Sequence, residues 1–134
     1  MPSQAAMKAA LKAYVDGLNA GDADAVIALF APDAEIEDPV GTPVKRGSEI
    51  EAWFRRAVEM RARLELAGPI RGSHGRAAAM AFTVTTRFEG QVIATRSVDA
   101  VRFDDAGRIT RLEGYWGPDD VEVGAPGASR GRSS

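Results

Sequence analysis

The sequence predicts an α+β domain, because helical and extended patterns occupy different parts of the chain. Apolar residues recur at helical spacing in roughly the first 60 residues. Beyond them, apolar and polar residues alternate with period two between tight turns. Helices that precede the long strands favour α+β over alternating βαβ units. With 134 residues, one domain is expected, and we place it at 1–122.

Three helices are expected in the N-terminal half, at 3–19, 23–31 and 48–60. Gly21 stops the first helix, and Asp22 is a plausible N-cap for the second. Pro32 ends the second helix. Ser48 with Glu51 three residues later predicts a capping box at the start of the third.

Extended segments follow and are expected at 34–38, 44–46, 63–70, 76–88, 91–103 and 108–116. Glu89-Gly90 predicts a tight hairpin between the two longest strands. Asp104 to Gly107 predicts the next turn. From 123 to 134 the chain is rich in Gly, Pro, Ser and Arg, which predicts a disordered tail.

Composition excludes several classes of function. A formal net charge of −2 with mixed signs offers no footprint for nucleic acid. The chain has no cysteine, and its one histidine, His74, lies in a Gly/Ser loop, so no metal site is expected. The N-terminus shows no signal sequence and no apolar run approaches a membrane span. We therefore expect a cytoplasmic protein without a membrane partner.

Asp38 is the first candidate for a functional side chain. In an extended segment it shares a face with Ala34 and Ile36, while the glutamates between them point the other way. Its carboxylate should therefore point into the fold, on a backbone that Pro39 keeps extended. The alternative is that Asp38 only caps the following turn.

Asp99 is the second candidate, because it lies in the same alternating row as Val101 and Phe103. A carboxyl group in apolar surroundings tends to stay protonated and can then donate a hydrogen bond. The alternative is an ion pair with Arg96 or Arg102, although both belong to the opposite row.

Tyr14 is the third candidate, on the apolar face of the first helix. A tyrosine in this position is usually part of the core, with its hydroxyl bonded to a nearby acceptor. Together with Asp38 and Asp99, however, it completes a set of one base and two donors. Such a set suits proton transfer next to a carbonyl, where donors stabilise the enolate oxygen.

Several short segments also match a known family, and they cover about residues 5 to 118: Tyr14-Val15, Leu18 to Asp22, Val26 to Phe30, Glu37 to Gly41, Ala81 to Val84, Val98-Asp99, Arg102-Phe103 and Gly107. In these segments the sequence resembles the ketosteroid isomerases (steroid Δ5-isomerases) of the NTF2-like superfamily. The resemblance implies a cone-shaped roll in which a strongly curved mixed sheet packs against three helices.

The same resemblance implies a reaction and a role in it for each of the three candidate residues. Asp38 would be the general base, and Tyr14 with protonated Asp99 would form the oxyanion hole. The reaction would convert 3-oxo-Δ5-steroids to 3-oxo-Δ4-steroids through a dienolate, without a cofactor. Asp38 would move the proton from C4 to C6.

Apolar positions that match the steroid cavity of the family are Phe54, Met80, Phe82, Phe88 and Trp116. Each of them could equally belong to an ordinary core. Some family members carry tyrosines that bond the oxyanion tyrosine, and the corresponding residues here are expected to be Phe30 and Phe54. Neither can donate a hydrogen bond.

Two other functions fit the same superfamily. One is a different enzyme, of the polyketide cyclase or epoxide hydrolase type, that uses Asp38 on another substrate. The other is a non-catalytic domain for binding small molecules. The resemblance also implies a homodimer, and the row Arg96, Val98, Ala100 and Arg102 is the expected outer face of the sheet.

Overall fold

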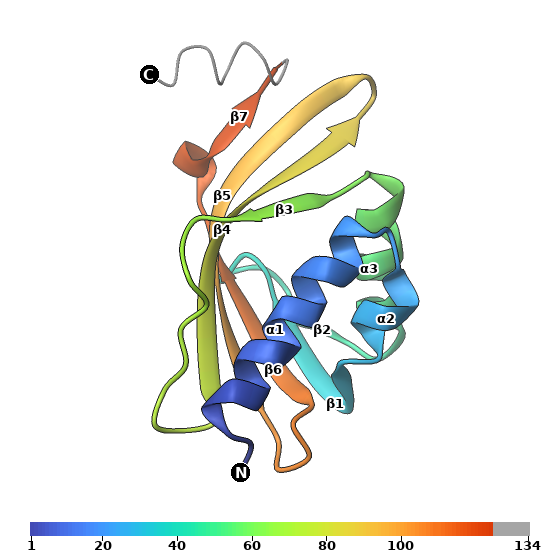
Figure 1. Cartoon of the computed structure of the whole chain (residues 1–134). Helices are drawn as coiled ribbons and strands as arrows, with labels where there is room; N and C mark the ends of the chain where they lie inside the picture. Colours follow the sequence, from blue (N-terminus) through green and yellow to red (C-terminus); the bar gives the residue numbers. More distant parts are fainter. Residues whose placement is uncertain (125–134) are drawn as a thin grey trace.

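The computed structural model of the protein describes residues 1–124, which form a curved seven-stranded sheet with helices against one face (Figure 1). The helices are α1 (Gln4–Asn19), α2 (Ala23–Ile27), α3 (Ser48–Glu59) and the 3-10 helix η1 (Pro118–Asp120). The strands are β1 (Phe30–Glu37), β2 (Lys45–Arg46), β3 (Arg63–Leu66), β4 (Ala77–Phe88), β5 (Gln91–Phe103), β6 (Ile109–Tyr115) and β7 (Val121–Val123). This arrangement confirms the predicted α+β class.

A side chain caps each of the first two helices, and the cap of the second was predicted. The Ser3 hydroxyl accepts a hydrogen bond from the backbone N–H of Ala6 at the start of α1 (3.0 Å). Asp22 caps α2 in the same way through Ala25 (3.1 Å). The apolar face of α1, which includes the fully buried Leu11, packs into the core beneath the sheet.

The predicted end of the second helix was wrong. α2 ends at Ile27, and the chain is already part of β1 at Phe30, so Pro32 lies inside a strand. The pairing of β1 with β6 is irregular between Phe30 and Glu35, around this proline. A bulge of this kind tolerates a residue that has no N–H to donate.

The predicted capping box of the third helix was also wrong. Gly47 is the N-cap of α3, with a φ of 56° that suits glycine, and no side chain caps the helix. The Glu49 carboxylate instead accepts a hydrogen bond from the Arg46 backbone N–H (3.0 Å). The end of β2 therefore determines how the helix begins.

The sheet is mixed, with the strand order β2-β1-β6-β5-β4-β3. β1 and β6 run parallel, and the other neighbouring strands run antiparallel. β4 and β5 form the long predicted hairpin, with paired residues from Ala77–Arg102 to Phe88–Gln91. β3 is shorter than expected and ends at Leu66, ahead of the Gly68-Pro69 break.

β7 was not predicted. It pairs with β5 next to Ile93 to Thr95 and widens the sheet beside the hairpin. Val123 ends this strand, so the sheet continues just past the expected domain end at 122. The expected tail of residues 123–134 lies outside the described residues, apart from Val123 and Gly124.

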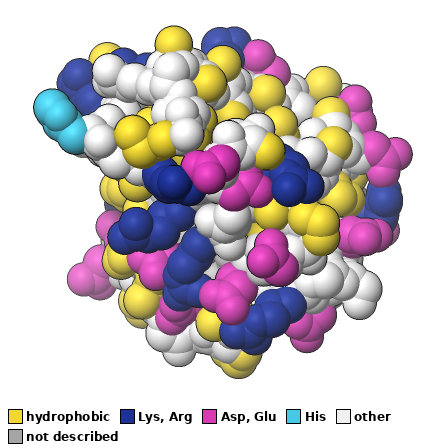
Figure 2. All heavy atoms as spheres, turned by 90° about the horizontal axis from the view of Figure 1, so that it is seen from below, with side chains coloured by type: hydrophobic (Ala, Val, Ile, Leu, Met, Phe, Trp, Pro, Cys, Tyr) yellow, Lys and Arg dark blue, Asp and Glu magenta, His cyan; other side chains and the backbone are white. Residues whose placement is uncertain are grey.

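The surface seen from below carries acidic and basic side chains interleaved with hydrophobic ones, and neither charge predominates on that face (Figure 2). Among residues 1–124, no helix is long and apolar enough to span a membrane. His74 is exposed in its loop.

Candidate active site

A cavity of about 340 Å³ lies between the helices and the inner face of the sheet. This volume is in the usual range for small-molecule sites. On the helical side it is lined by Leu18 of α1 and by Trp53, Phe54, Arg56, Ala57 and Met60 of α3. On the sheet it is lined by Phe82, Val84, Thr86, Ile93, Thr95 and Ser97. Tyr14, Asp38 and Asp99 all line it as well, so the three candidates predicted from the sequence share one cavity.

Asp38 directly follows β1, where the buried Ala34 and Ile36 share its row as predicted. The indole Nε1–H of Trp116 donates a hydrogen bond to Asp38 Oδ1 (3.1 Å). Burial raises the pKa of the Asp38 carboxyl, while this hydrogen bond and the nearby Lys45 ammonium act to lower it. A carboxylate with a moderately raised pKa is well suited to accept a proton near neutral pH.

Gly114 of β6 makes room for the Asp38 carboxylate. A Cβ atom built at this position would overlap the Asp38 carboxyl group. The Gly114 carbonyl also accepts a hydrogen bond from the backbone N–H of Val40 (2.8 Å), which ties the turn after Asp38 to β6. Gly114 is in register with Asp99 on β5, so one β6 residue lies beside both carboxyl groups.

Asp99 is 1% exposed, and neither of its carboxyl oxygens has a hydrogen-bond partner among the described residues. The predicted alternative, an ion pair with Arg96 or Arg102, is absent there, because both arginines lie on the exposed face of β5. Burial, with the charge of Asp38 second, raises the pKa of Asp99 well above its usual value. Burial therefore favours the neutral form of Asp99, which has an O–H to donate.

The Tyr14 side chain is buried, and within residues 1–124 its hydroxyl makes no hydrogen bond. Burial, followed by the charges of Asp99 and Asp38, raises the pKa of Tyr14 well above its usual value. Its ring packs edge-on against Phe54 (centroids 5.7 Å apart) and at a tilt against Phe30 (6.5 Å). Its nearest aromatic neighbours are thus phenylalanines that cannot polarise the hydroxyl.

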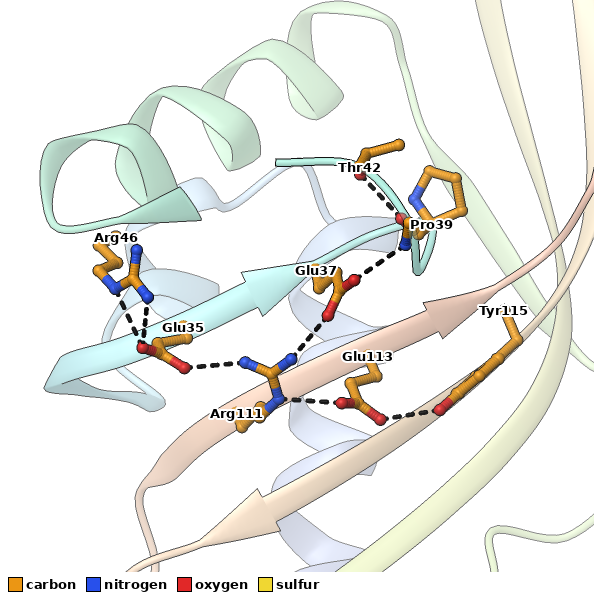
Figure 3. A network of polar contacts seen from close by, with 9 residues as sticks. Glu35, Glu37, Pro39, Thr42, Arg46, Arg111, Glu113 and Tyr115 are labelled. Carbon is orange, nitrogen blue, oxygen red and sulfur yellow. Dashed lines mark hydrogen bonds and ion pairs between the residues drawn. The ribbon is translucent and has the colours of Figure 1, made fainter. Parts of the chain in front are cut away.

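A network of charged groups supports the Asp38 turn from the other face of the sheet (Figure 3). The Arg111 guanidinium bonds the carboxylates of Glu35 (2.8 Å), Glu37 (2.7 Å) and Glu113 (2.9 Å). The second oxygen of Glu37 accepts the backbone N–H of Gly41 (2.8 Å). The residue before Asp38 therefore links β6 to the turn that follows Asp38.

The five predicted substrate contacts fall into two groups. Phe54, Phe82 and Trp116 line the cavity. Met80 is buried in the core and is paired in register with Asp99, where it helps to exclude water from that carboxyl. Phe88 is 41% exposed near the hairpin turn, and neither it nor Met80 lines the cavity.

Sequence reasoning missed much of the lining. The spacing on α3 had placed Trp53 on the inner face of the helix, but not Ala57 one turn later or Met60 directly after the helix. Ser97 and Thr95 lie in the row of Asp99, where polar residues among apolar ones were a usable signal. The role of Gly114 had no such signal, because it depends on the register between β5 and β6.

Comparison with known proteins identifies the family of the chain. Residues 11–112 match the family model of the SnoaL-like domain. The chain belongs to the SnoaL-like family. It is 37% identical over 120 residues to the steroid Delta-isomerase of Nocardioides simplex, across 89% of this chain and 96% of that protein. The resemblance inferred from short segments is thereby confirmed.

Other SnoaL-like relatives have different names. The chain is 29% identical over 125 residues to the epoxide hydrolase LasB of Streptomyces lasalocidi, covering 90% of this chain and 44% of that protein. Among solved structures it resembles SalBIII, an epoxide hydrolase/cyclase-like enzyme with a role in pyran ring formation in the polyether salinomycin. That match has a TM-score of 0.85 and 26% identity, over 92% of this chain and 99% of SalBIII. The curved mixed sheet with three helices is thus the NTF2-like fold that the resemblance implied.

Proposed function

We propose that the protein is a cofactor-independent steroid Δ5-isomerase that converts 3-oxo-Δ5-steroids to 3-oxo-Δ4-steroids. The observation that carries the proposal is Asp99, a buried carboxyl with a raised pKa and no hydrogen-bond partner in the described part of the chain, which lines the same cavity as Asp38 and Tyr14. A buried donor left unpaired in the protein is costly unless a ligand uses it. The 37% identity to a steroid Delta-isomerase supports the same reaction.

In the proposed mechanism Asp38 is the general base. Trp116 occupies Oδ1, which leaves Oδ2 for the proton that is removed from C4 of the substrate. The same oxygen returns that proton to C6, so the carboxylate is regenerated in each cycle. The conjugated Δ4 ketone is the product, and no other reactant is consumed.

Tyr14 and Asp99 are the proposed donors to the C3 oxygen. Negative charge develops on this oxygen as the dienolate forms, and buried donors stabilise it more than they stabilise the neutral ketone. Burial raises the pKa of both groups and so favours their neutral forms, which can donate a hydrogen bond. Phe54, Phe82 and Trp116 are the proposed apolar contacts to the rings.

The decisive experiment uses purified protein and 5-androstene-3,17-dione, with the ultraviolet absorbance of the conjugated enone as the signal. We expect turnover, and we expect Asp38→Asn to lower kcat by about a hundredfold or more, because the amide cannot accept the proton. Binding of the Δ4 product should persist in this variant. If Asp38→Asn kept over a tenth of the original kcat, Asp38 would not be the general base. Steroid binding by the original protein without any turnover would indicate a non-catalytic domain.

A second candidate, epoxide opening, is favoured by the similarity to LasB and SalBIII. Protonated Asp99 could protonate an epoxide oxygen while Asp38 activates a nucleophile. The same preparation should therefore be offered a cyclic epoxide of similar size. Opening of the epoxide without isomerisation of the steroid would replace the first proposal by the second.

We also propose a homodimer, formed through the outer face of the sheet. Val98 on β5 is 42% exposed and is in register with Tyr115 on β6, which is 48% exposed. The charged residues Arg96 and Arg102 flank Val98 in the same row. Exposed apolar side chains on a sheet, bordered by charged ones, are typical of an interface between subunits.

A further inference from the structure

The cavity has a cationic side chain that the proposed isomerisation does not use. Asp38 and Asp99 are its two carboxyl groups, and Arg56 of α3 is its one basic residue within the described part of the chain. Arg56 lies on α3 three residues after Trp53, and Met60 follows directly after the helix. The other residues that line this side of the cavity are mostly apolar.

Arg56 lies at the end of the cavity away from the two carboxyl groups. Its guanidinium sits over the ring of Phe88, 5.6 Å from the centroid. The end of α3 is held to the same hairpin, because the Met60 carbonyl accepts the Arg87 backbone N–H (2.7 Å). Met80, the partner of Asp99, is eight residues before Phe88 on β4, which is roughly 26 Å along the strand.

A polar row connects the two ends. Asp99, Ser97 and Thr95 alternate along the inner face of β5 and line the cavity. Asp99 and Thr95 are four residues apart, or about 13 Å along the strand, and Thr86 continues the lining toward Arg56. A steroid whose ketone lies at Asp99 would extend along this row, with its farthest ring and its side chain directed toward Arg56.

The hydrogen-bond donors of Arg56 are available to a ligand. Glu59 is its nearest carboxylate, at 3.8 Å, and within residues 1–124 the guanidinium makes no hydrogen bond. The neighbouring Arg55 differs, because it bonds Asp24 at 2.8 Å and does not line the cavity. Both arginine side chains are about half exposed. They differ because Arg55 is hydrogen-bonded to a carboxylate, whereas only Arg56 lines the cavity.

We propose that Arg56 forms a subsite for a carboxylate at the far end of the substrate. The preferred substrate class is then a 3-oxo-Δ5-steroid whose side chain ends in a carboxylate. A guanidinium binds a carboxylate through two parallel hydrogen bonds, and the Phe88 ring holds its plane from one side. This inference rests on the proposed isomerase function, since it assumes that the ring ketone lies at Tyr14 and Asp99.

The test compares two 3-oxo-Δ5-steroids with the same rings, one with a neutral side chain and one with a side chain ending in a carboxylate. Arg56→Gln should raise KM for the acid about fivefold, the upper range for an exposed ion pair, and should raise KM for the neutral substrate less than that. Arg56→Lys should keep part of the preference for the acid over the neutral substrate. Added salt should weaken this preference in the original protein.

Arg55→Gln is the matched control and should leave kcat and KM unchanged for both substrates. Equal values of kcat/KM for the acid in the original protein and in Arg56→Gln would overturn the subsite. An equal loss for both substrates would do the same, since it would indicate a structural role for Arg56.

A binding measurement separates this inference from the isomerase proposal. Trp53 and Trp116 both line the cavity, so their fluorescence should change when a Δ4 product binds. A preference for the acidic product that disappears in Arg56→Gln would establish the subsite even if no steroid were isomerised. Turnover of the neutral steroid without that preference would overturn the subsite alone.

Discussion

The proposed role of Asp99 would come at a cost in stability. Among residues 1–124 its buried carboxyl has no partner, which costs about 1–3 kcal/mol in typical proteins. The folded state holds the proton of Asp99 more tightly than the unfolded state, because burial raises its pKa. The contribution of Asp99 to stability is therefore greatest below the ordinary Asp pKa and falls as pH rises toward the raised one, by up to about 1.4 kcal/mol per pH unit.

We expect Asp99→Leu to raise the free energy of unfolding at pH 7 by about 1–3 kcal/mol, because it removes an unpaired buried carboxyl. The same change should lower kcat by roughly a hundred- to thousandfold, the usual cost of one oxyanion donor. Denaturant unfolding at several pH values, together with steady-state kinetics, measures both. Asp99→Asn keeps a donor and should lose less activity. An unchanged kcat in Asp99→Leu would mean that Asp99 is purely structural.

Trp116 should control the pH at which the base becomes active. Its indole N–H stabilises the Asp38 carboxylate and so lowers the pKa of Asp38. Trp116→Phe removes that bond, the Asp38 pKa rises, and the acidic limb of the kcat profile should move to higher pH. Tyr115→Phe is the control, since Tyr115 bonds Glu113 on the exposed face. A limb that shifts to lower pH or stays in place would contradict the assignment.

The strand β6 positions Asp38, the proposed base. It supplies Gly114 beneath the Asp38 carboxylate, and Arg111 and Glu113 on the opposite face. Because Glu37 joins Arg111 to the backbone of Gly41, the turn around Asp38 is held on both sides. This double attachment suits a base that has to keep its position while it shuttles a proton.

We expect Gly114→Val to lower kcat at least tenfold, since the new side chain would take the place of the Asp38 carboxylate. Gly114→Ala should lower kcat less than Gly114→Val does. Gly117→Ala, at a position where a Cβ meets only Asp120 Oδ2 at 4.0 Å, should keep its activity. Kinetics are compared at equal folded fraction, checked by circular dichroism. Full activity in Gly114→Val would show that Asp38 tolerates displacement.

The elements that sequence reasoning predicted well are those determined locally. β4 and β5 lie within one residue of their predicted bounds, because long extended patterns flank Glu89-Gly90, which fixes the turn. The inward direction of Asp99 followed from the same alternation. β7, the early start of β1 and the place of Gly114 depend on pairing with distant strands. A local pattern contains no information on that pairing.

The outer face of the whole sheet is the proposed interface of the homodimer. We expect sedimentation to show a dimer at micromolar concentration, and Val98→Glu to shift it toward monomer by burying a charge in the interface. Isomerase activity should survive in the monomer, because the Asp38 cavity lies on the inner face. Sedimentation of the original protein as a monomer alone would contradict the interface.

The parallel pairing of β1 with β6 also has a consequence for how the protein acquires its activity. Trp116 and Asp38 are 78 residues apart in the sequence, and they meet only across this pairing. Contacts of such long range form slowly, since the intervening chain must first be ordered. During refolding, we therefore expect catalytic activity to appear only with the last cooperative phase, after the local β4–β5 hairpin has formed. An intermediate that contains the hairpin should have no base in position.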